Sequence, residues 1–411
     1  MKILVITSSY PRNEKDFSGL FVQDWVESLA CRGIQSRVLA WRGEGASSTQ
    51  RVRFVPYGPK EWETLFFGNG GPENLRENPL RVLLALPAMA QMWRAAEEEL
   101  RKGEYDALVA HWLVPAGLLV RGLGARYGLP SFVVGHSGGV HLLGKLGPLG
   151  SALAGPLGRG ALTLPSEGLK EKWKALSPFQ SDPLVAPMGY SPFDTKKHGR
   201  RRGYQQKDEV RFGFLGRLVA IKGLEVVLKA FRQWWPDSGR RPLLEILGSG
   251  AMEHEWRAMA GDESANVRFL GPLFGDEKAR RVASWDFLVL PSKRSASGRH
   301  EGLPVSLLEA SSLGVIPLVG HIPGVERWLA EPNRQIIDSA AAEVWQNELH
   351  KCATLEEQEL TNWQEATKEI VAPLAWESYS AWWAAWLQGP RSSSAPTSGI
   401  ASGTTRLGGR H

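Results

Sequence analysis

The sequence predicts an α/β protein with two domains, each built on a mostly parallel sheet. Three observations lead to this prediction. Short apolar runs alternate with helical patterns along most of the 411 residues, which is typical of βαβ units. The series is interrupted by a basic, glycine-bearing segment at residues 193–209, and a second series follows it. Several apolar runs lead into glycine-containing loops, where ligands bind in open parallel sheets.

The first domain is predicted to span residues 1–192. Residues 1–7 are too short for the apolar region of a secretory signal and form its first strand instead. A helix follows, with Val22 and Trp25 on its apolar face and Gly33 as its stop. The further strands are expected at Arg37–Trp41, Val52–Tyr57, Ala107–Trp112, Ser131–Gly135, Ala161–Pro165 and Val185–Gly189.

The second domain is predicted to span residues 210–372. An aromatic helix is expected after it, at residues 373–388. Residues 389–411 are mostly small and polar, and they carry too little apolar surface to stay ordered. The strands of this domain are expected at Phe212–Leu215, Leu243–Leu247, Val267–Leu270, Phe287–Leu290 and Val315–Val319.

A first segment of the second domain predicts an anion site. Residues 216–223 read Gly-Arg-Leu-Val-Ala-Ile-Lys-Gly, between an apolar run and a helical pattern. Arg217 and Lys222 therefore lie on a strand-to-helix loop. Loops of this kind form the ligand-binding edge of a parallel sheet.

A second segment, Glu301 to Glu309, predicts the rest of this site. Pro304 suits the first turn of a helix. The free backbone N–H groups of about residues 303–306 would point at an anion. Glu309 lies inside the helix and Glu301 in the loop before it. Two cations, a helix N-terminus and two carboxylates indicate a diphosphate bound beside hydroxyl-bearing groups.

The two glutamates are spaced E-x7-E and follow a G-R-L-x-x-x-K-G loop. This combination resembles the retaining, nucleotide-sugar-dependent glycosyltransferases of the GT-B fold, the family 4-like glycosyl transferases group 1. The resemblance runs from about residue 1 to residue 388. It implies two facing Rossmann-like domains with a central cleft, and a C-terminal helix that crosses back to the first domain. Other landmarks of the family follow in order at residues 10–22, 106–117, 132–136 and 187–190.

The resemblance implies catalytic roles for four residues. Arg217 and Lys222 would stabilise the departing diphosphate in place of a metal ion, because the sequence contains no Asp-x-Asp. Glu301 would lie near the transferred sugar; the alternative is a structural pairing with His300 or Arg299. His136, at a strand end, would face the sugar; the alternative is a structural histidine.

The remaining site residues would bind the nucleotide. Glu309 would bind the ribose hydroxyls, since a glutamate among apolar helix neighbours needs a partner. Gly19 and Gly248 would bring backbone close to the donor, although either could be a plain turn glycine. The loop and helix start at Gly302, Leu303, Pro304 and Val305 would contact the phosphates.

The composition predicts the location of the protein and the charge of its partners. Only Cys31 and Cys352 occur, so no disulfide framework is present and a reducing, cytoplasmic location is expected. The sequence contains no run of 18 apolar residues, so no membrane span is predicted. The formal net charge of +6 favours anionic partners without identifying one.

The acceptor side is expected to use the first domain. The aromatic residues Trp62, Phe66 and Phe67, with basic residues nearby, and the apolar segment 142–164 are candidates for contact with the inner face of the membrane or with a lipid-linked acceptor. The alternative is that they form core or a mobile flap.

The sequence thus predicts a retaining, metal-independent glycosyltransferase that uses a nucleotide-sugar donor and a glycan or lipid-linked acceptor. No cofactor or nucleic acid partner is expected. A non-catalytic sugar-nucleotide-binding subunit and a nucleotide-sugar epimerase are the alternatives.

Overall fold

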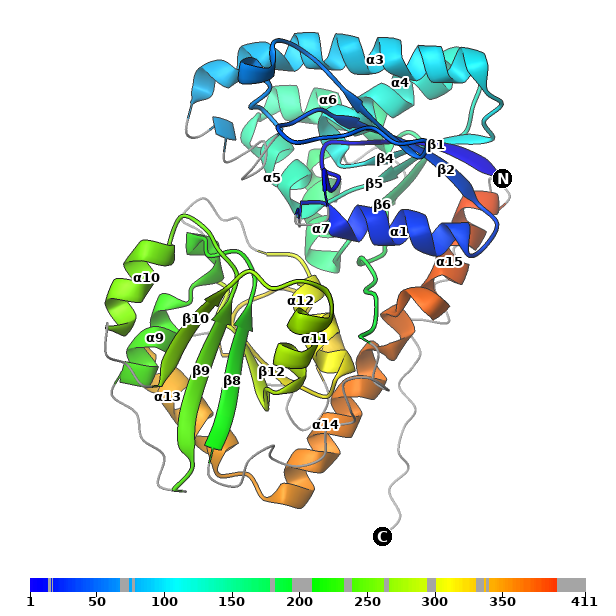
Figure 1. Cartoon of the computed structure of the whole chain (residues 1–411). Coiled ribbons are helices and arrows are strands. Elements are labelled where there is room, and N and C mark those ends of the chain that lie inside the picture. Colours follow the sequence, from blue (N-terminus) through cyan, green and yellow to red (C-terminus); the bar gives the residue numbers. More distant parts are fainter. Residues whose placement is uncertain are drawn as a thin grey trace. The chain divides into compact units, whose positions relative to one another are not determined.

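The computed structural model contains two α/β units (Figure 1). The structure describes residues 1–389 except 14–15, 17, 67–73, 76–77, 178–181, 194–208, 233–238, 262–265, 294–300, 330–335 and 338–339. The first unit comprises Met1–Leu164, Leu169–Ala186 and the last helix; the second comprises Pro165–Gly168 and Pro187–Ala375. Most of the predicted linker and the tail beyond residue 389 lie outside the described residues.

The first unit is built on a parallel seven-stranded sheet with the order β3-β2-β1-β4-β5-β6-β7. Six of the seven apolar runs of the first predicted series form strands over most of their length, so these predictions are confirmed. The run predicted at Val185–Gly189 shares only Val185 with β7, so that prediction is wrong beyond Val185. The strands are β1 (Lys2–Thr7), β2 (Gln35–Trp41), β3 (Val52–Val55), β4 (Ala107–His111), β5 (Ser131–Val134), β6 (Ala161–Leu164) and β7 (Leu184–Val185).

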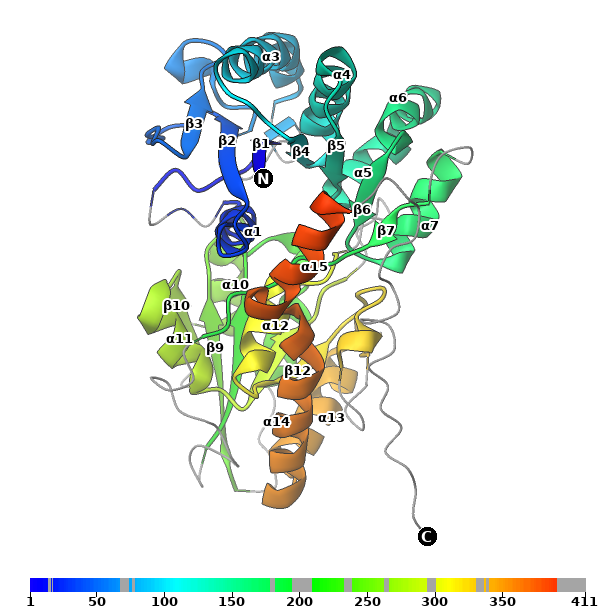
Figure 2. The same cartoon turned by 90° about the vertical axis from the view of Figure 1, so that its right-hand side faces the viewer.

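Helices cover both faces of this sheet (Figures 1 and 2). The helices α3, α4 and α6 lie on one face, and α1 lies with α15 on the other. The main core fills the space beneath α3 and α4, where Met92 and Val120 meet Leu4 and Leu108 of the central strands. The helices are α1 (Leu20–Ala30), α3 (Ala85–Lys102), α4 (Leu118–Tyr127), α5 (Ser137–Lys145), α6 (Pro148–Gly158), α7 (Glu167–Leu176) and α15 (Trp376–Gln388), with short turns η1 (Lys60–Trp62), η2 (Pro79–Leu84) and η3 (Leu113–Gly117).

The last helix, α15, packs on α1 within the first unit. The rings of Trp383 and Trp25 are both fully buried, and their centroids lie 5.8 Å apart. Arg32 donates a hydrogen bond from Nε to Ser380 Oγ at 3.0 Å. The aromatic segment at the end of the chain therefore completes the apolar layer over α1.

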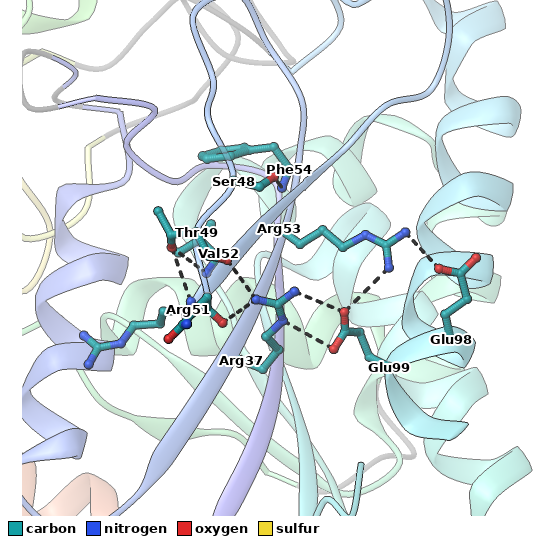
Figure 3. A network of polar contacts seen from close by, with 10 residues as sticks. Arg37, Ser48, Thr49, Arg51, Val52, Arg53, Phe54, Glu98 and Glu99 are labelled. Atoms are coloured by element: carbon teal, nitrogen blue, oxygen red, sulfur yellow. Dashed lines mark hydrogen bonds and ion pairs between the residues drawn. The ribbon is translucent and has the colours of Figure 1, made fainter. Parts of the chain in front are cut away.

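A polar network joins the edge of the same sheet to α3 (Figure 3). Arg37 of β2 donates to both carboxylate oxygens of Glu99, at 3.3 and 3.2 Å. Arg53 of β3 donates to Glu98 at 2.9 Å. These bonds fix α3 against β2 and β3, and with it the short turn η2 that precedes α3.

The second unit is built on a parallel five-stranded sheet with the order β10-β9-β8-β11-β12. The strand order reverses between β8 and β11, which makes the carboxyl ends of these two strands a switch point where ligands bind. The second predicted series of strands is also confirmed. The strands are β8 (Glu209–Leu215), β9 (Arg241–Leu247), β10 (Val267–Gly271), β11 (Phe287–Leu290) and β12 (Ile316–Val319).

Helices again cover both faces of this sheet. The helices α9, α10 and α13 lie on one face, and α11, α12 and α14 lie on the other (Figure 1). They are α9 (Glu225–Arg232), α10 (Glu253–Ala260), α11 (Gly275–Ala283), α12 (Val305–Ser312), α13 (Ala342–Ala353) and α14 (Glu357–Val371), with short turns η4 (Ala220–Lys222), η5 (Glu326–Trp328) and η6 (Ala372–Leu374).

The second unit begins earlier in the chain than the predicted domain does. Residues 187–193 group with it. The backbone N–H of Tyr190 donates to Leu374 O at 3.1 Å, and the ammonium of Lys278 lies 5.5 Å from the centre of the Phe193 ring. These contacts involve residues distant in sequence, so the composition of the linker did not indicate them. None of the helices in the described ranges is long and apolar enough to cross a membrane.

Candidate functional site

The loop after β8 places Lys222 in the second unit. The loop ends in the turn η4 and in Gly223, which has a φ of 65°. A Cβ at Gly223 would lie 2.2 Å from the carbonyl oxygen of Pro291, so only glycine lets the loop turn at this point. Lys222 is buried, with 8% of its surface exposed, and forms an ion pair with Glu301.

Glu301 is held by two loops. Its Oε1 pairs with Lys222, and its Oε2 accepts a hydrogen bond from Ser292 Oγ at 2.6 Å. Ser292 follows β11, so residues from the carboxyl ends of both switch-point strands meet at this carboxylate. The alternative neighbours Arg299 and His300 lie outside the described residues. The sequence had shown Ser292 only as the end of an apolar run.

Arg217 lies on the same loop as Lys222 and is exposed. Gly248, at the end of β9, supports this loop: its φ is 141°, and a Cβ there would lie 1.9 Å from the carbonyl oxygen of Gly216. The contact between the two loops by itself explains a glycine at position 248. Its contact with a donor stays a prediction.

The helix α12 begins at Val305, with Pro304 as its N-cap. The expectation that residues 303–306 all offer a free N–H is wrong at Pro304, because proline has no backbone N–H. Gly302 and Leu303 form the loop between Glu301 and the helix. The N-terminus of α12 thus lies directly after the carboxylate that pairs with Lys222, and its dipole adds positive potential at this place.

Glu309 has a partner that the sequence did not show. Both of its carboxylate oxygens lie 2.8 Å from Nζ of Lys278, on α11. The neighbours Leu307 and Leu308 are fully buried, as expected from the apolar helix pattern. Lys278 has no motif around it, and only the fold brings α11 beside α12, so sequence reasoning could not assign this pair.

His136 lies in the first unit, between β5 and α5, and is buried. Burial lowers its pKa to about 3, so the imidazole is neutral at physiological pH. Its ring lies 4.5 Å from the ring of Trp112 and 5.1 Å from that of Phe21. His111, noted in the sequence only as a family landmark, places Nδ1 3.4 Å from Nε2 of His136.

Gly19 precedes α1 in the first unit. It has a φ of 77°, and a Cβ there would lie 2.4 Å from the carbonyl oxygen of Ser9. This close approach requires glycine without reference to a phosphate. A donor contact at Gly19 stays a prediction.

The second unit thus gathers a buried ammonium, a helix N-terminus and an exposed guanidinium at the carboxyl ends of β8 and β11. This arrangement suits an anion such as a diphosphate. Within the described residues, no cluster of three or more His, Cys, Asp or Glu side chains is arranged to hold a metal ion.

Comparison with known proteins finds similarity to one family over most of the second unit. Residues 196–370 match the family model of glycosyl transferases group 1. A GDP-mannose-dependent monoacylated alpha-(1-6)-phosphatidylinositol monomannoside mannosyltransferase of Corynebacterium glutamicum is 31% identical over 125 residues, 30% of this chain and 32% of that protein. The amylovoran biosynthesis glycosyltransferase AmsK of Erwinia amylovora is 34% identical over 127 residues, 28% of this chain and 31% of that protein. The matches therefore span about a third of these relatives' length.

Solved structures extend the likeness to the whole fold. HepE of Anabaena, in complex with UDP and glucose, superposes with a TM-score of 0.66 at 14% identity, covering 95% of this chain and 100% of that one. The lipopolysaccharide outer core galactosyltransferase WaaB gives a TM-score of 0.64 at 14% identity, covering 94% and 99%. The fold is that of GT-B glycosyltransferases, as predicted. The match to the family model covers residues 196–370, less than half of the chain.

Proposed function

We propose that the protein is a retaining, metal-independent glycosyltransferase. It transfers a sugar from a nucleoside-diphosphate sugar to a glycan or lipid-linked acceptor, in the synthesis of a cell-surface polysaccharide or glycolipid. Support comes from the group 1 match over residues 196–370 and from relatives named as a mannosyltransferase and a polysaccharide-biosynthesis glycosyltransferase.

The ion pair of the buried Lys222 with the partly buried Glu301, next to the N-terminus of α12, is the observation that carries this proposal. A departing nucleoside diphosphate gains negative charge in the transition state. A fixed cation in a water-poor site stabilises such charge by roughly 3 kcal/mol. Arg217, exposed on the same loop, supplies the second cation when the donor binds.

The pair of Glu309 and Lys278 suits the ribose of the donor. The two bonds to Lys278 orient the carboxylate on α12, so its oxygens can accept hydrogen bonds from two adjacent hydroxyl groups. Glu309 therefore acts in binding, before any bond is broken.

The metal-independent part of the proposal rests on the chemistry of the side chains, and the retaining part rests on the resemblance to the family 4-like glycosyltransferases. No Asp-x-Asp occurs in the sequence, and Lys222 and Arg217 supply positive charge where a metal would otherwise do so. Glu301 is engaged by Lys222 and Ser292, which suits a positioning group better than a covalent nucleophile. The acceptor then attacks on the face that the diphosphate leaves, and the diphosphate accepts the acceptor's proton.

A thermal-shift screen against GDP, UDP and ADP tests donor binding. A ligand that binds only the folded state at 100 times its Kd stabilises it by about 2.7 kcal/mol. GDP is tested first, because the Corynebacterium relative is named as GDP-mannose-dependent. We expect one nucleotide to raise the Tm of the wild type and to raise that of Lys222→Ala much less. No rise with any nucleoside diphosphate would contradict the proposal.

Incubation with the donor and without an acceptor distinguishes a transferase from the two alternatives, an epimerase and a non-catalytic subunit. An epimerase changes the sugar without an acceptor, and a non-catalytic subunit binds the donor but neither transfers nor hydrolyses it. A transferase gives slow hydrolysis alone and turnover when acceptor is added.

An apolar stripe on the first unit supports contact with the inner face of the membrane. Leu80, Leu83 and Leu86, spaced three residues apart on η2 and the start of α3, are 71%, 72% and 77% exposed. The only charged residues from position 78 to 96 are Arg81 and Arg94. An exposed apolar stripe with positive charge and no acid suits an anionic lipid surface.

This stripe does not consist of the residues that the sequence predicted for contact with the membrane or a lipid-linked acceptor. Phe66 is partly buried and stacks on Trp41 at 4.5 Å, so it belongs to the core and not to a contact surface. Trp62 is 63% exposed, and Phe67 lies outside the described residues. In the apolar segment 142–164, Leu149 is exposed, whereas Leu157 is buried.

Cosedimentation with phosphatidylglycerol-containing and with purely phosphatidylcholine vesicles tests the contact. We expect binding to the anionic vesicles, lost in Leu83→Ser/Leu86→Ser. Val344→Ser, at an exposed position of α13 in the second unit, is the matched control and keeps binding. If the double variant instead converts a dimer to a monomer and leaves vesicle binding unchanged, the stripe contacts a second copy and not lipid.

A further inference from the structure

Two buried histidines of the first unit face each other. His111 ends β4 and His136 follows β5, the neighbouring strand. Nδ1 of His111 lies 3.4 Å from Nε2 of His136, and the ring planes are inclined by only 21°. The two nitrogens are therefore placed for one N–H···N hydrogen bond.

Both rings are neutral at physiological pH. Burial lowers the pKa of His136 to about 3, and burial with the neighbouring histidine lowers that of His111 well below its ordinary value. A neutral imidazole carries one proton, on one of its two nitrogens. Only one of the two facing nitrogens can then be the donor, and the choice fixes the tautomers of both rings.

The surroundings of His111 decide which nitrogen donates. Its Nε2 is buried and has no hydrogen-bond partner in the part of the chain that the structure describes. Its ring lies 4.7 Å from that of Trp25, edge to face. A proton on Nε2 would leave a buried N–H group without an acceptor. An unsatisfied buried donor costs more free energy than a buried acceptor nitrogen that receives no hydrogen bond. The proton of His111 therefore lies on Nδ1, which donates to Nε2 of His136.

This bond leaves His136 with its own proton on Nδ1. Phe21 and Trp112 pack against the ring, so it cannot turn to exchange its nitrogens without displacing them. The bond from His111 is the one hydrogen bond that the ring of His136 makes with the described residues. The Nδ1–H group remains as a donor for a ligand oxygen.

We propose that His111 is a positioning residue that holds His136 in the tautomer with the proton on Nδ1, as a donor to a hydroxyl or ring oxygen of a bound sugar. The tautomer follows from the geometry of the pair and from its buried surroundings. Its use on a sugar rests on the proposed function.

Long-range ¹H–¹⁵N correlation spectra of the ¹⁵N-histidine-labelled full chain test the tautomer. The spectra of His136→Ala and His111→Phe identify the two rings among the nine histidines. We expect the wild type to show Nδ1–H for both. His111→Phe keeps a ring against Trp25 but removes the donor, so His136 should shift toward Nε2–H. His111→Asn supplies an amide N–H near the Nδ1 position and should restore the wild-type pattern.

Two results would overturn the inference. One is Nε2–H on His136 in the wild type, a spectrum that needs no variant to fold. The other is an unchanged His136 tautomer in folded His111→Phe. Neither depends on a transfer assay, so failure of the proposed glycosyltransferase function would leave this result standing.

The transfer assay then tests the use of the tautomer. His111→Phe should lower kcat by about tenfold, the lower end of the loss caused by removing the group that orients a metal-ligating histidine. The KM for the donor should change less, and His111→Asn should recover most of the rate. Equal kcat in His111→Phe and the wild type would overturn the role in transfer.

Discussion

Replacement of Lys222 by methionine is the most direct test of the diphosphate site. Methionine keeps most of the apolar stem of lysine and removes the ammonium group. Glu301 would then lose its ion-pair partner while keeping the hydrogen bond from Ser292. The experiment therefore separates the effect of the charge from that of the side-chain volume.

The structure sets the expected magnitudes. Removal of one partner of a buried ion pair costs about 3–5 kcal/mol of stability. The side chain of Glu301 is 19% exposed and retains the Ser292 hydroxyl, so about 1–3 kcal/mol is expected here. A domain stable by about 5–15 kcal/mol stays folded under this loss. Turnover should fall about 10²–10³-fold, the effect of removing one charge-stabilising group in the transition state.

A double-mutant cycle with Glu301→Gln shows whether the lysine acts on the ligand or only on its partner. If Lys222 serves only to neutralise Glu301, Lys222→Met should cost no further turnover in the Glu301→Gln background. If it stabilises the departing diphosphate, Lys222→Met should lower the turnover of Glu301→Gln by about as many fold as it lowers that of the wild type. Lys293→Met, which breaks an exposed ion pair with Glu225, is the matched control and should keep near wild-type turnover.

The reasoning is refuted by either of two results in steady-state assays of purified, folded protein. One is turnover of Lys222→Met within a few-fold of the wild type. The other is a Glu301→Gln background in which Lys222→Met causes no further loss of turnover.

Four further predictions follow from the same structure. Transfer should continue in EDTA; complete loss that Mg²⁺ or Mn²⁺ restores would show that a metal supplies the charge. Glu309→Gln should weaken nucleoside diphosphate binding measured by calorimetry, whereas Glu301→Gln should mainly slow transfer, and equal effects on binding would contradict this division. Truncation after Gln388 should leave the Tm nearly unchanged. Truncation before Pro373 removes Trp383 from its contact with Trp25 and should lower the Tm strongly. An equal loss of Tm in both variants would assign a docking role to residues 389–411. The exposed thiol of Cys31 should react with a disulfide reagent in the folded protein, and Cys352, whose pKa is raised by burial, only on unfolding; equal rates would contradict the burial of Cys352.

The sheet strands were predictable because each is an apolar run with nearby turn signals. The two parallel series and the basic segment between them carry this information locally, so the fold class followed. The inclusion of residues 187–193 in the second unit depends on contacts such as that between Tyr190 and Leu374. Such contacts join positions far apart in sequence and leave no local pattern.

The candidate site was predictable only where spacing places residues on one loop or helix turn. Arg217 and Lys222 share a loop, and Glu309 follows Pro304 on one helix. Lys278 and Ser292, which bind the two glutamates, come from other elements and have no such spacing. The exposed stripe of Leu80, Leu83 and Leu86 was missed because apolar periodicity normally marks a buried face.

The packing of α15 on α1 has a consequence for synthesis of the chain. Arg32 and Ser380, which join these helices, are 348 positions apart. Domains generally fold as they leave the ribosome, the N-terminal one first. Here the apolar surface of α1 around Trp25 stays without its cover until α15, at Trp376–Gln388, has been made. During translation this surface is available to chaperones, and the first unit becomes complete only after the second has emerged.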